Sequence, residues 1–273
     1  MAPEITLDPC ADPSEVAGMR DAHLRSLIAP MDGMWESFAN AATHTRINAD
    51  GEQAGYYVLN DEGILLQLYI DPAFQRYSRV LFDRVIAQAS VRQAMAGTID
   101  PAFLSLCLDV HKSVTVHTLL YEHDGEVHAE TVRDNGLTFR LIDSSELDRT
   151  VALQLACLGA GAELGQWLRG YSANLIDRKE LFVLCRDDDW LGLGECRKSD
   201  SQDRVADLGM MVAPDHRGRG LATDILNRLV AISTHAGLRP ICSTTVDNTN
   251  AQRAIVRAGF VSLHRLLSVT FLA

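Results

Sequence analysis

The segment from Met211 to Asp224, which reads MVAPDHRGRGLATD, constrains the fold of this chain more than any other. An apolar run of strand length precedes its loop, and apolar residues at helical spacing follow it. The first N–H groups of a helix have no partner inside the helix and carry partial positive charge, so an anion fits there. Gly218 and Gly220 leave these amides uncovered, and two arginines add positive charge. The segment therefore predicts a strand, a phosphate-binding loop and a helix in succession.

The order R-x-x-G-x-A at Arg217 to Ala222 resembles the acyl-CoA pyrophosphate loop of the GCN5-related N-acetyltransferase (GNAT) superfamily. Ile241 to Asp247 looks like the next strand of that fold, reached by a right-handed crossover. Asn248 to Phe260 is similar to the family's N-x-x-A helix, which ends in Gly-Phe. The signature G-x-x-x-x-G-K-[ST] is absent, which argues against a nucleoside triphosphatase. The alternative is a surface turn rich in Gly and Arg that binds no ligand.

The resemblance implies acetyl-CoA as a co-substrate, held by the second half of the chain. In the family the strands on either side of the loop helix separate, and pantetheine lies between them. The resemblance assigns Met211 and Val212 to pantetheine and the acyl group, with the Val212 N–H region as an oxyanion donor. It matches Asn248 to an asparagine that bonds the pantetheine arm, with Asn250 as a neighbouring alternative, although an Asn here also suits a helix cap. The pyrophosphate ligands that it implies are Arg217, Gly218, Arg219, Gly220, Leu221 and Ala222.

The groups that would move protons are less defined. Many family members carry a Tyr in the last helix that protonates the departing thiolate, and Ile255 stands at that position. A water, another side chain or no general acid would then serve. Asp207 and Glu195, on the two strands before the loop, are candidates to relay a proton from a bound ammonium. The alternative is that Asp207 pairs with Arg204 or another surface cation and that Glu195 is an exposed strand residue.

The first half of the chain repeats the pattern of the second half without its loop glycines. The strand and helix around Pro72 match those around Pro214, but Tyr77 and Arg79 crowd the turn. Both halves also open on a short apolar strand followed by Asp. The positions that correspond to Arg217, Gly220 and Ala222 are Gln75, Ser78 and Val80.

These repeats predict an α/β (α+β) fold of two tandem GNAT-like domains, each a mixed, mostly antiparallel twisted sheet flanked by helices. The polar segment Glu130 to Gly136 indicates the boundary, with a degenerate domain without cofactor at 1–132 and an acyl-CoA-binding catalytic domain at 133–273. The alternative to a duplication is that similar alternations of strand and helix recur in the two halves by chance. The first half would be a scaffold, a pseudo-dimer partner or a wall of the acceptor pocket, in a monomer or a homodimer. The C-terminal VSLHRLLSVTFLA leaves room for one long or bent strand, which the other half or a second subunit would complete.

Charge and composition narrow the class of partner and the compartment. The net charge of -11 disfavours nucleic acid as a partner. No apolar run reaches membrane-spanning length and no leader precedes Pro3, so we expect a cytoplasmic protein that does not enter membranes. The six cysteines lack C-x-x-C spacing and indicate reduced thiols rather than a disulfide frame or zinc site. No metal is expected at His111, His117, His123 and His128 either, because turn residues interrupt the strand that holds them.

The amine acceptor is expected among the helices between Asp143 and Lys179. The segment from Gly159 to Gly165 is not a dinucleotide fingerprint, because its final Gly comes one residue late, and it predicts a turn between helices. Trp167, just after it, suits either an acceptor site or the core. The candidates to shape the acceptor site are Glu163, Trp167, Arg169 and Tyr171.

Three functions fit these patterns. The leading hypothesis is an N-acetyltransferase (EC 2.3.1 class) that transfers acetyl from acetyl-CoA to a primary amine of a small molecule, peptide or protein, by direct attack in a ternary complex. The alternative is a non-catalytic acyl-CoA-binding regulatory or sensor module, which the missing Tyr permits. A structural or interaction role is the third, and the intact loop argues against it.

Overall fold

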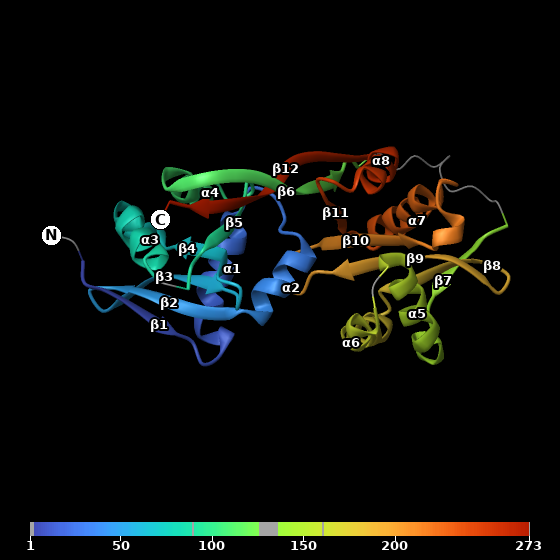
Figure 1. Ribbon diagram of the computed structural model, residues 1–273, viewed down its shortest axis with the longest axis horizontal. Coiled ribbons are helices and arrows are strands. Elements are labelled where there is room, and N and C mark those ends of the chain that lie inside the picture. The colour runs from blue at the N-terminus through green and yellow to red at the C-terminus, as the bar shows by residue number, and fades with distance from the viewer. Residues whose placement is uncertain (1–2, 89, 126–135, 160, 273) are drawn as a thin grey trace. The chain divides into compact units, whose positions relative to one another are not determined.

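The chain divides into two compact units in the computed structural model, which describes residues 3–88, 90–125, 136–159 and 161–272 (Figure 1). The first unit contains Met1–Leu120 together with His264–Ala273, and the second contains Tyr121–Leu263. His128 and most of the predicted boundary segment lie outside the described residues. The division into 1–132 and 133–273 therefore stays a prediction.

The first unit is built on a sheet with the strand order β1-β2-β3-β4-β5-β12. Neighbouring strands run antiparallel except for β4 and β5, which run parallel. Side chains of α3 and α4 cover one face, and those of α1 and α2 contribute to clusters on the other. The elements are β1 (Ile5–Pro9), α1 (Ala17–Ser26), α2 (Gly33–Ala41), β2 (Thr43–Ala49), β3 (Glu52–Leu59), β4 (Ile64–Ile70), α3 (Ser78–Ile86), β5 (Gln93–Gly97), α4 (Pro101–Asp109), β6 (His111–His123), which continues into the second unit, and the end of β12 (Phe260–Phe271).

The second unit repeats this plan with the strand order β11-β10-β9-β8-β7. Here β10 and β11 are the parallel pair, and the other neighbours are antiparallel. Figure 1 shows α7 on one side of these strands and α5 with α6 on the other. The elements are β7 (Thr138–Leu141), α5 (Leu147–Leu158), α6 (Gly165–Asp177), β8 (Leu181–Arg186), β9 (Asp189–Lys198), β10 (Val205–Val212), α7 (Leu221–His235), β11 (Arg239–Thr245) and α8 (Thr249–Arg257).

The predicted fold class is confirmed, since each unit is a mixed, mostly antiparallel sheet flanked by helices. The apolar run Val205–Val212 is a strand, and α7 follows the glycine loop as predicted. The segment between Gly159 and Gly165 separates two helices, with Gly159 in the left-handed conformation that ends α5. None of the helices in the described part of the chain is both long and apolar enough to span a membrane.

The two units also share a capping box that the sequence comparison of the halves overlooked. Asp12 caps the turn before α1, and Glu15 accepts a hydrogen bond from the Asp12 N–H. Asp143 and Glu146 form the same box before α5. In each case a D-x-x-E sequence satisfies the free amides at the start of a helical segment. The shared box adds a further correspondence between the halves.

The C-terminal strand β12 is a single long strand, as the sequence indicated. Its residues Leu266 to Thr270 pair antiparallel with Gly97 to Gln93 of β5. Because His264–Ala273 belong to the first unit, the last residues of the chain complete the sheet of the first half. The sequence suggested that the first half or a second subunit would complete the sheet of the second half, whereas here the end of the second half completes the sheet of the first.

Glycines of β9 allow α7 to pack closely on the sheet. A Cβ atom at Gly192 would lie 2.5 Å from the carbonyl oxygen of Met211 and 2.9 Å from Ile225 Cδ1. Both distances are too short for carbon, and the first neighbour is backbone that cannot rotate away. The position therefore admits only glycine without displacing β10 or α7.

We expect Gly192→Ala to destabilise the second unit by about 1–3 kcal/mol, the usual cost of overpacking. Chemical denaturation followed by circular dichroism measures this loss. Gly170→Ala is the matched control, because a Cβ there meets no atom within 4 Å and α6 gains helix propensity. Equal stability of Gly192→Ala and the wild type would contradict the close packing of α7.

Candidate functional site

The two parallel strands of the second unit separate after a short pairing. Val205 to Asp207 of β10 pair with Arg239 to Ile241 of β11, and no further pair joins these strands among the described residues. Beyond that point β10 stays paired with β9, as far as Val212 opposite Gly192. The backbone groups on the free edge of β10 are therefore available to a ligand that lies between the strands.

The loop between β10 and α7 presents unpaired amides. Gly218 and Gly220 have φ angles of 78° and 81°, in the left-handed region that favours glycine, and Gly220 is the N-cap of α7. Within the described ranges, the N–H groups from Gly218 to Thr223 donate no hydrogen bond to another residue. A run of free amides at the start of a 15-residue helix has the geometry and partial positive charge that suit an anion. We call residues 218–223 the amide cradle.

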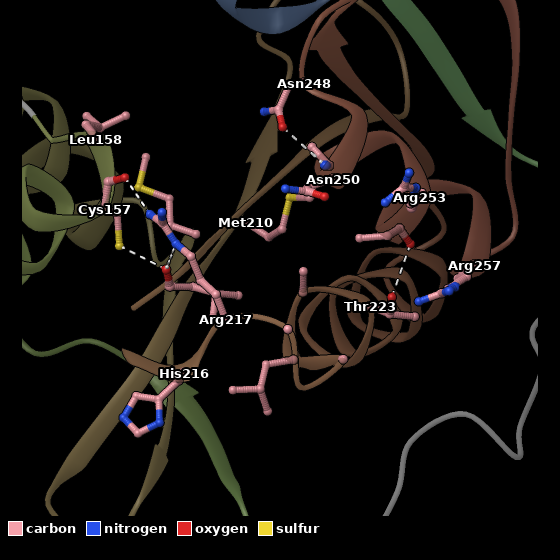
Figure 2. Close-up of a pocket in the computed structure, with 18 residues that line it drawn as sticks. Cys157, Leu158, Met210, His216, Arg217, Thr223, Asn248, Asn250, Arg253 and Arg257 are labelled. Atoms are coloured by element: carbon pink, nitrogen blue, oxygen red, sulfur yellow. Dashed lines mark hydrogen bonds between the residues drawn. The ribbon is translucent and has the colours of Figure 1, made fainter. Parts of the chain in front are cut away.

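The loop arginines bond to carbonyl oxygens of the protein. Arg217 donates from Nη2 to the carbonyl of Cys157 at 2.7 Å and from Nε to that of Val212 at 3.3 Å (Figure 2). Arg219 donates to the carbonyl of Asp215 at 3.1 Å. Arg217 thus ties the end of α5 to the end of β10, a structural role that the sequence pattern did not reveal. The amides, rather than the two guanidinium groups, form the inner surface of the cradle.

A pocket of about 670 Å³ lies between the loop, β10, α8 and the end of α5. It contains eight of the nine residues predicted to bind the cofactor, and Arg219 is the one that does not line it. The predicted residues that line it are Met211, Val212, Arg217, Gly218, Gly220, Leu221, Ala222 and Asn248. Asn250, the alternative to Asn248, also lines the pocket. The lining residues that sequence reasoning missed are Cys157, Leu158, Met210, His216, Thr223, Ala251, Arg253, Ala254 and Arg257.

Two of these lining residues, Asn248 and Cys157, have contacts that define their local role, whereas Ile255 does not line the pocket. Asn248 accepts a hydrogen bond from the Ala251 N–H at 3.2 Å, so it caps α8 and borders the pocket at once. The Cys157 thiol donates to the Val212 carbonyl at 3.4 Å, and burial raises the pKa of this thiol while Arg217 lowers it. Ile255 is 1 % exposed and belongs to the core, so it offers no proton to the pocket.

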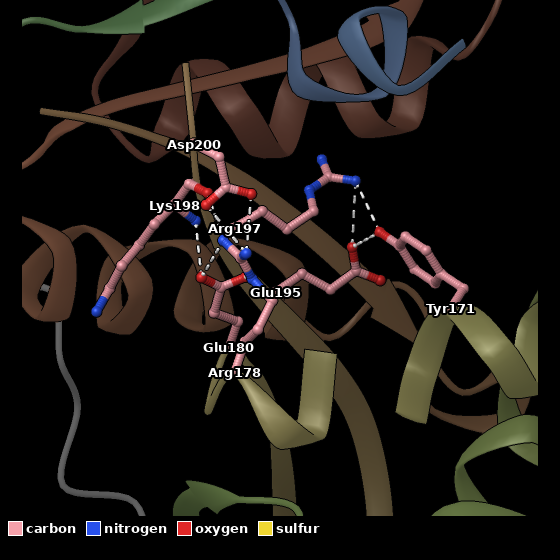
Figure 3. A network of polar contacts seen from close by, with 7 residues as sticks. All are labelled: Tyr171, Arg178, Glu180, Glu195, Arg197, Lys198 and Asp200. Carbon is pink, nitrogen blue, oxygen red and sulfur yellow. Dashed lines mark hydrogen bonds and ion pairs between the residues drawn. The ribbon is translucent and has the colours of Figure 1, made fainter. Parts of the chain in front are cut away.

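The two candidate carboxylates lie in one polar network on the face of the sheet that α6 covers. Glu195 Oε2 accepts from the Tyr171 hydroxyl at 2.7 Å, and Arg197 Nη1 lies 3.4 Å from the same oxygen (Figure 3). Arg197 also donates to Asp207 Oδ2 at 2.8 Å and to the Tyr171 hydroxyl at 2.8 Å. Glu195 is 7 % exposed and Asp207 3 %, so Glu195 is not the exposed strand residue of the alternative. The cation beside Asp207 is the partly buried Arg197, not Arg204.

The two carboxylate oxygens of Glu195 have different contacts. Glu195 Oε1 has no hydrogen-bond partner among the residues described, while Oε2 is held by Tyr171 and Arg197. Opposite Glu195 on β10 is Gly209, where a Cβ atom would lie 3.2 Å from the carboxylate. Burial and the Glu195 charge raise the pKa of Tyr171, so its hydroxyl stays protonated and donates. One oxygen of Glu195 is thus held by two side chains, and the other has no partner in the part of the chain that the structure describes.

The predicted acceptor candidates are Trp167, Arg169 and Tyr171 on α6 and Glu163 in the turn before it, and their contacts differ. Trp167 is 50 % exposed and stacks on Tyr171 with ring centroids 5.0 Å apart, so it is not a core residue. Arg169 pairs with Asp148, and Glu163 is exposed. Trp167 and Tyr171 therefore form an aromatic wall beside Glu195, whereas Arg169 joins α6 to α5.

A neighbouring ion network is structural. Arg178 donates to Glu180 at 2.9 Å and to Asp200 at 2.9 Å, and its Nη2 bonds the Lys198 carbonyl at 2.8 Å (Figure 3). Glu180 is buried and also accepts from the Lys198 N–H. These contacts join the residues at the end of the β8–β9 pair. Both carboxylate oxygens of Glu180 and of Asp200 accept hydrogen bonds, unlike those of Glu195.

The first unit lacks the amide cradle at the corresponding place. Residues Pro72–Tyr77 form a helical turn that runs directly into α3, and the Ser78 N–H bonds the Gln75 carbonyl. Ser78 has a φ of −49°, so the loop with two left-handed glycines has no equivalent. Between β4 and β5, the cavity lined by Gln67 and Met95 measures only about 30 Å³.

Buried side chains occupy that position in the first unit. His23 lies 2.8 Å from the Tyr56 hydroxyl and 2.7 Å from Asp100 Oδ2, and the Tyr56 hydroxyl donates to Gln67. His23 and Gln67 both line the small cavity. A space of this size holds about one water molecule and no pantetheine.

Comparisons with known proteins agree with the duplicated fold. The profile of the acetyltransferase (GNAT) domain matches residues 13–124, and that of the acetyltransferase (GNAT) family matches residues 151–260. A solved structure of an acetyltransferase from the GNAT family of Colwellia psychrerythraea is 34 % identical, with a TM-score of 0.90, over 98 % of this chain and 100 % of that one. The comparison with curated proteins found no match.

Two more distant solved structures share the fold across the full length. A tandem GNAT protein from the clavulanic acid biosynthesis pathway is 14 % identical, with a TM-score of 0.68, over 98 % of each chain. A GCN5-related N-acetyltransferase from Sphaerobacter thermophilus is 17 % identical, with a TM-score of 0.65, over 99 % of this chain and 97 % of that one. At these identities the likeness concerns the fold alone.

Proposed function

The chain belongs to the GNAT acetyltransferase family, and we propose that it transfers an acetyl group from acetyl-CoA to a primary amine of a small molecule, peptide or protein. The observation that carries the proposal is the amide cradle at the start of α7, next to the gap between β10 and β11. A diphosphate accepts hydrogen bonds from such amides, and an extended chain of amide groups bonds to the free edge of β10. The pocket volume of about 670 Å³ suits a ligand of this kind.

The cofactor is proposed to bind the second unit alone. The corresponding turn of the first unit uses the Ser78 amide internally and has no left-handed glycine. Its cavity between β4 and β5 is about 30 Å³. The first unit is therefore proposed as a degenerate copy without cofactor.

Acetyl-CoA supplies the thioester carbonyl that the amine attacks, and the CoA thiolate leaves as the C–N bond forms. The Val212 N–H is proposed to stabilise the oxyanion. The direction of this N–H supports the role. The Ala213 N–H donates to the Leu191 carbonyl of β9, and along an antiparallel pair the N–H groups of successive residues point alternately toward and away from the partner strand. The Val212 N–H is therefore directed away from β9, toward the gap.

Glu195 is proposed to take the proton that the ammonium must lose before attack. Its Oε1 is free, its Oε2 is fixed by Tyr171 and Arg197, and it lies over Gly209, two residues before Met211. Asp207 is less suited to proton transfer because Arg197 holds its Oδ2 at 2.8 Å and it is more deeply buried. A water between Glu195 and the amine would serve as the relay.

Thiol release from acetyl-CoA, measured with a panel of amines, tests the proposal. We expect at least one of the amino acids, polyamines, aminoglycosides or peptide N-termini to raise the rate of thiol release above that without acceptor. Acetyl-CoA is also expected to raise the melting temperature. Stabilisation without turnover on any amine would instead favour the non-catalytic sensor, a function consistent with the buried Ile255. The absence of both stabilisation and turnover would contradict both functions.

A further inference from the structure

Two arginines of α8 line the pocket and have no partner in the part of the chain that the structure describes. Arg253 and Arg257 are one helical turn apart, and both border the pocket that contains the amide cradle. Both side chains are exposed, and neither forms a hydrogen bond or ion pair with any residue in the described ranges. Arg217, the third arginine of the lining, is already bonded to two carbonyl oxygens. Arg253 and Arg257 thus supply guanidinium groups whose donors are not used by any of the described residues.

The contact between α7 and α8 places these arginines at the cradle. The Thr223 hydroxyl, in the first turn of α7, donates to the Ala254 carbonyl at 3.3 Å. Ala254 lies between the two arginines in the sequence of α8. Figure 2 shows Arg253 and Arg257 along one side of the pocket, with Arg217 and Cys157 along the other. The unpaired cations therefore flank the end of the cradle that α7 forms.

The positive charge of Arg253 and Arg257 suits an anionic group in addition to the diphosphate proposed for the amide cradle. The chain as a whole carries a net charge of -11, so two adjacent arginines without a carboxylate partner are a local exception. The cradle amides already offer donors for a diphosphate. Guanidinium groups match the oxygen geometry of phosphate and bind it through paired, charge-assisted hydrogen bonds.

We propose that Arg253 and Arg257 form a phosphomonoester subsite that binds the 3′-phosphate of CoA, separate from the diphosphate in the amide cradle. This inference rests on the proposed function, because it takes CoA as the ligand of the pocket. It makes the pocket selective for CoA over CoA derivatives that lack the 3′-phosphate.

Calorimetric titration with CoA and with 3′-dephospho-CoA tests the subsite. We expect the wild-type protein to bind CoA about 10- to 100-fold more tightly than 3′-dephospho-CoA, the effect of one or two charge-assisted hydrogen bonds. In the double variant Arg253→Gln/Arg257→Gln, CoA affinity should fall to that of 3′-dephospho-CoA, while the affinity for 3′-dephospho-CoA stays within about twofold of the wild type.

The double variant Arg84→Gln/Arg186→Gln is the matched control. It removes the same charge at exposed arginines outside the pocket, and it should keep the wild-type preference for CoA. Equal wild-type affinity for the two ligands would overturn the subsite and leave the proposed function intact. Loss of both ligands in the Arg253/Arg257 variant would also overturn it, since the arginines would then support the pocket itself. Failure of both ligands to bind the wild type would contradict the proposed function.

Discussion

Gly220→Glu is expected to abolish the rise in melting temperature that acetyl-CoA produces. No atom lies within 4 Å of a Cβ built at Gly220, so a side chain there extends into open space beside the amide cradle. A carboxylate in that space blocks the amides sterically and repels a diphosphate. The left-handed φ of 81° adds about 1–2 kcal/mol of strain for any L side chain. The ligand-induced shift must therefore be measured against the variant's own melting temperature without ligand.

Two further variants separate occlusion of the cradle from backbone strain. Gly220→Asn places an uncharged residue that tolerates the left-handed conformation at the same position, and it should keep part of the shift. Ser78→Glu, at the corresponding position of the first unit, should leave the shift unchanged, because that turn has no cradle. An undiminished shift in Gly220→Glu would refute cofactor binding by the second unit. Loss of the shift in Ser78→Glu would refute the proposal that the first unit binds no cofactor.

Glu195→Gln is expected to lower kcat by about 10²- to 10⁴-fold, the usual contribution of a general base, while acetyl-CoA affinity stays unchanged. The substitution keeps the size of the side chain and an oxygen for the Tyr171 hydroxyl, which lies 2.7 Å from Glu195. It removes the group that accepts the proton. Steady-state kinetics with the acceptor found in the amine panel, together with calorimetric binding of CoA, measures both quantities.

Asp207→Asn is the control for charge in the same network. Asp207 is bonded to Arg197 and is proposed to have no contact with the amine, so we expect a smaller loss of kcat than for Glu195→Gln. Tyr171→Phe removes the hydroxyl that orients Glu195 and should fall between the two. Near-normal kcat in Glu195→Gln, or an equal loss in Asp207→Asn, would contradict the assignment of Glu195 as the base. Melting temperatures of all three variants show whether any loss reflects unfolding.

The elements around the glycine loop were predictable because local signals fix them. The apolar run of β10, the paired glycines and the helical spacing of α7 all act within 30 residues of sequence. The split of the parallel strands and the fold of both halves followed from the resemblance. Cofactor contact by these residues stays a prediction.

Long-range contacts explain what the sequence did not reveal. Arg217 has the position of a phosphate ligand in the motif, yet it bonds the Cys157 carbonyl, 60 residues away along the chain. Glu195 on β9 accepts a hydrogen bond from Tyr171 on α6, and neither residue carries a local signal of that contact. Arg253 and Arg257 were visible at helical spacing, but only the α7–α8 contact shows that they border the pocket.

The pairing of β12 with β5 has a consequence for how the protein folds during synthesis. The residues of β5 are synthesised well before residues 264–273, so the edge of β5 that pairs with β12 lacks this partner until the second half has been translated. Such edges template aggregation unless another strand covers them. The first half therefore reaches its final sheet only after the second half has been translated, and the nascent chain depends on its last segment to close that edge.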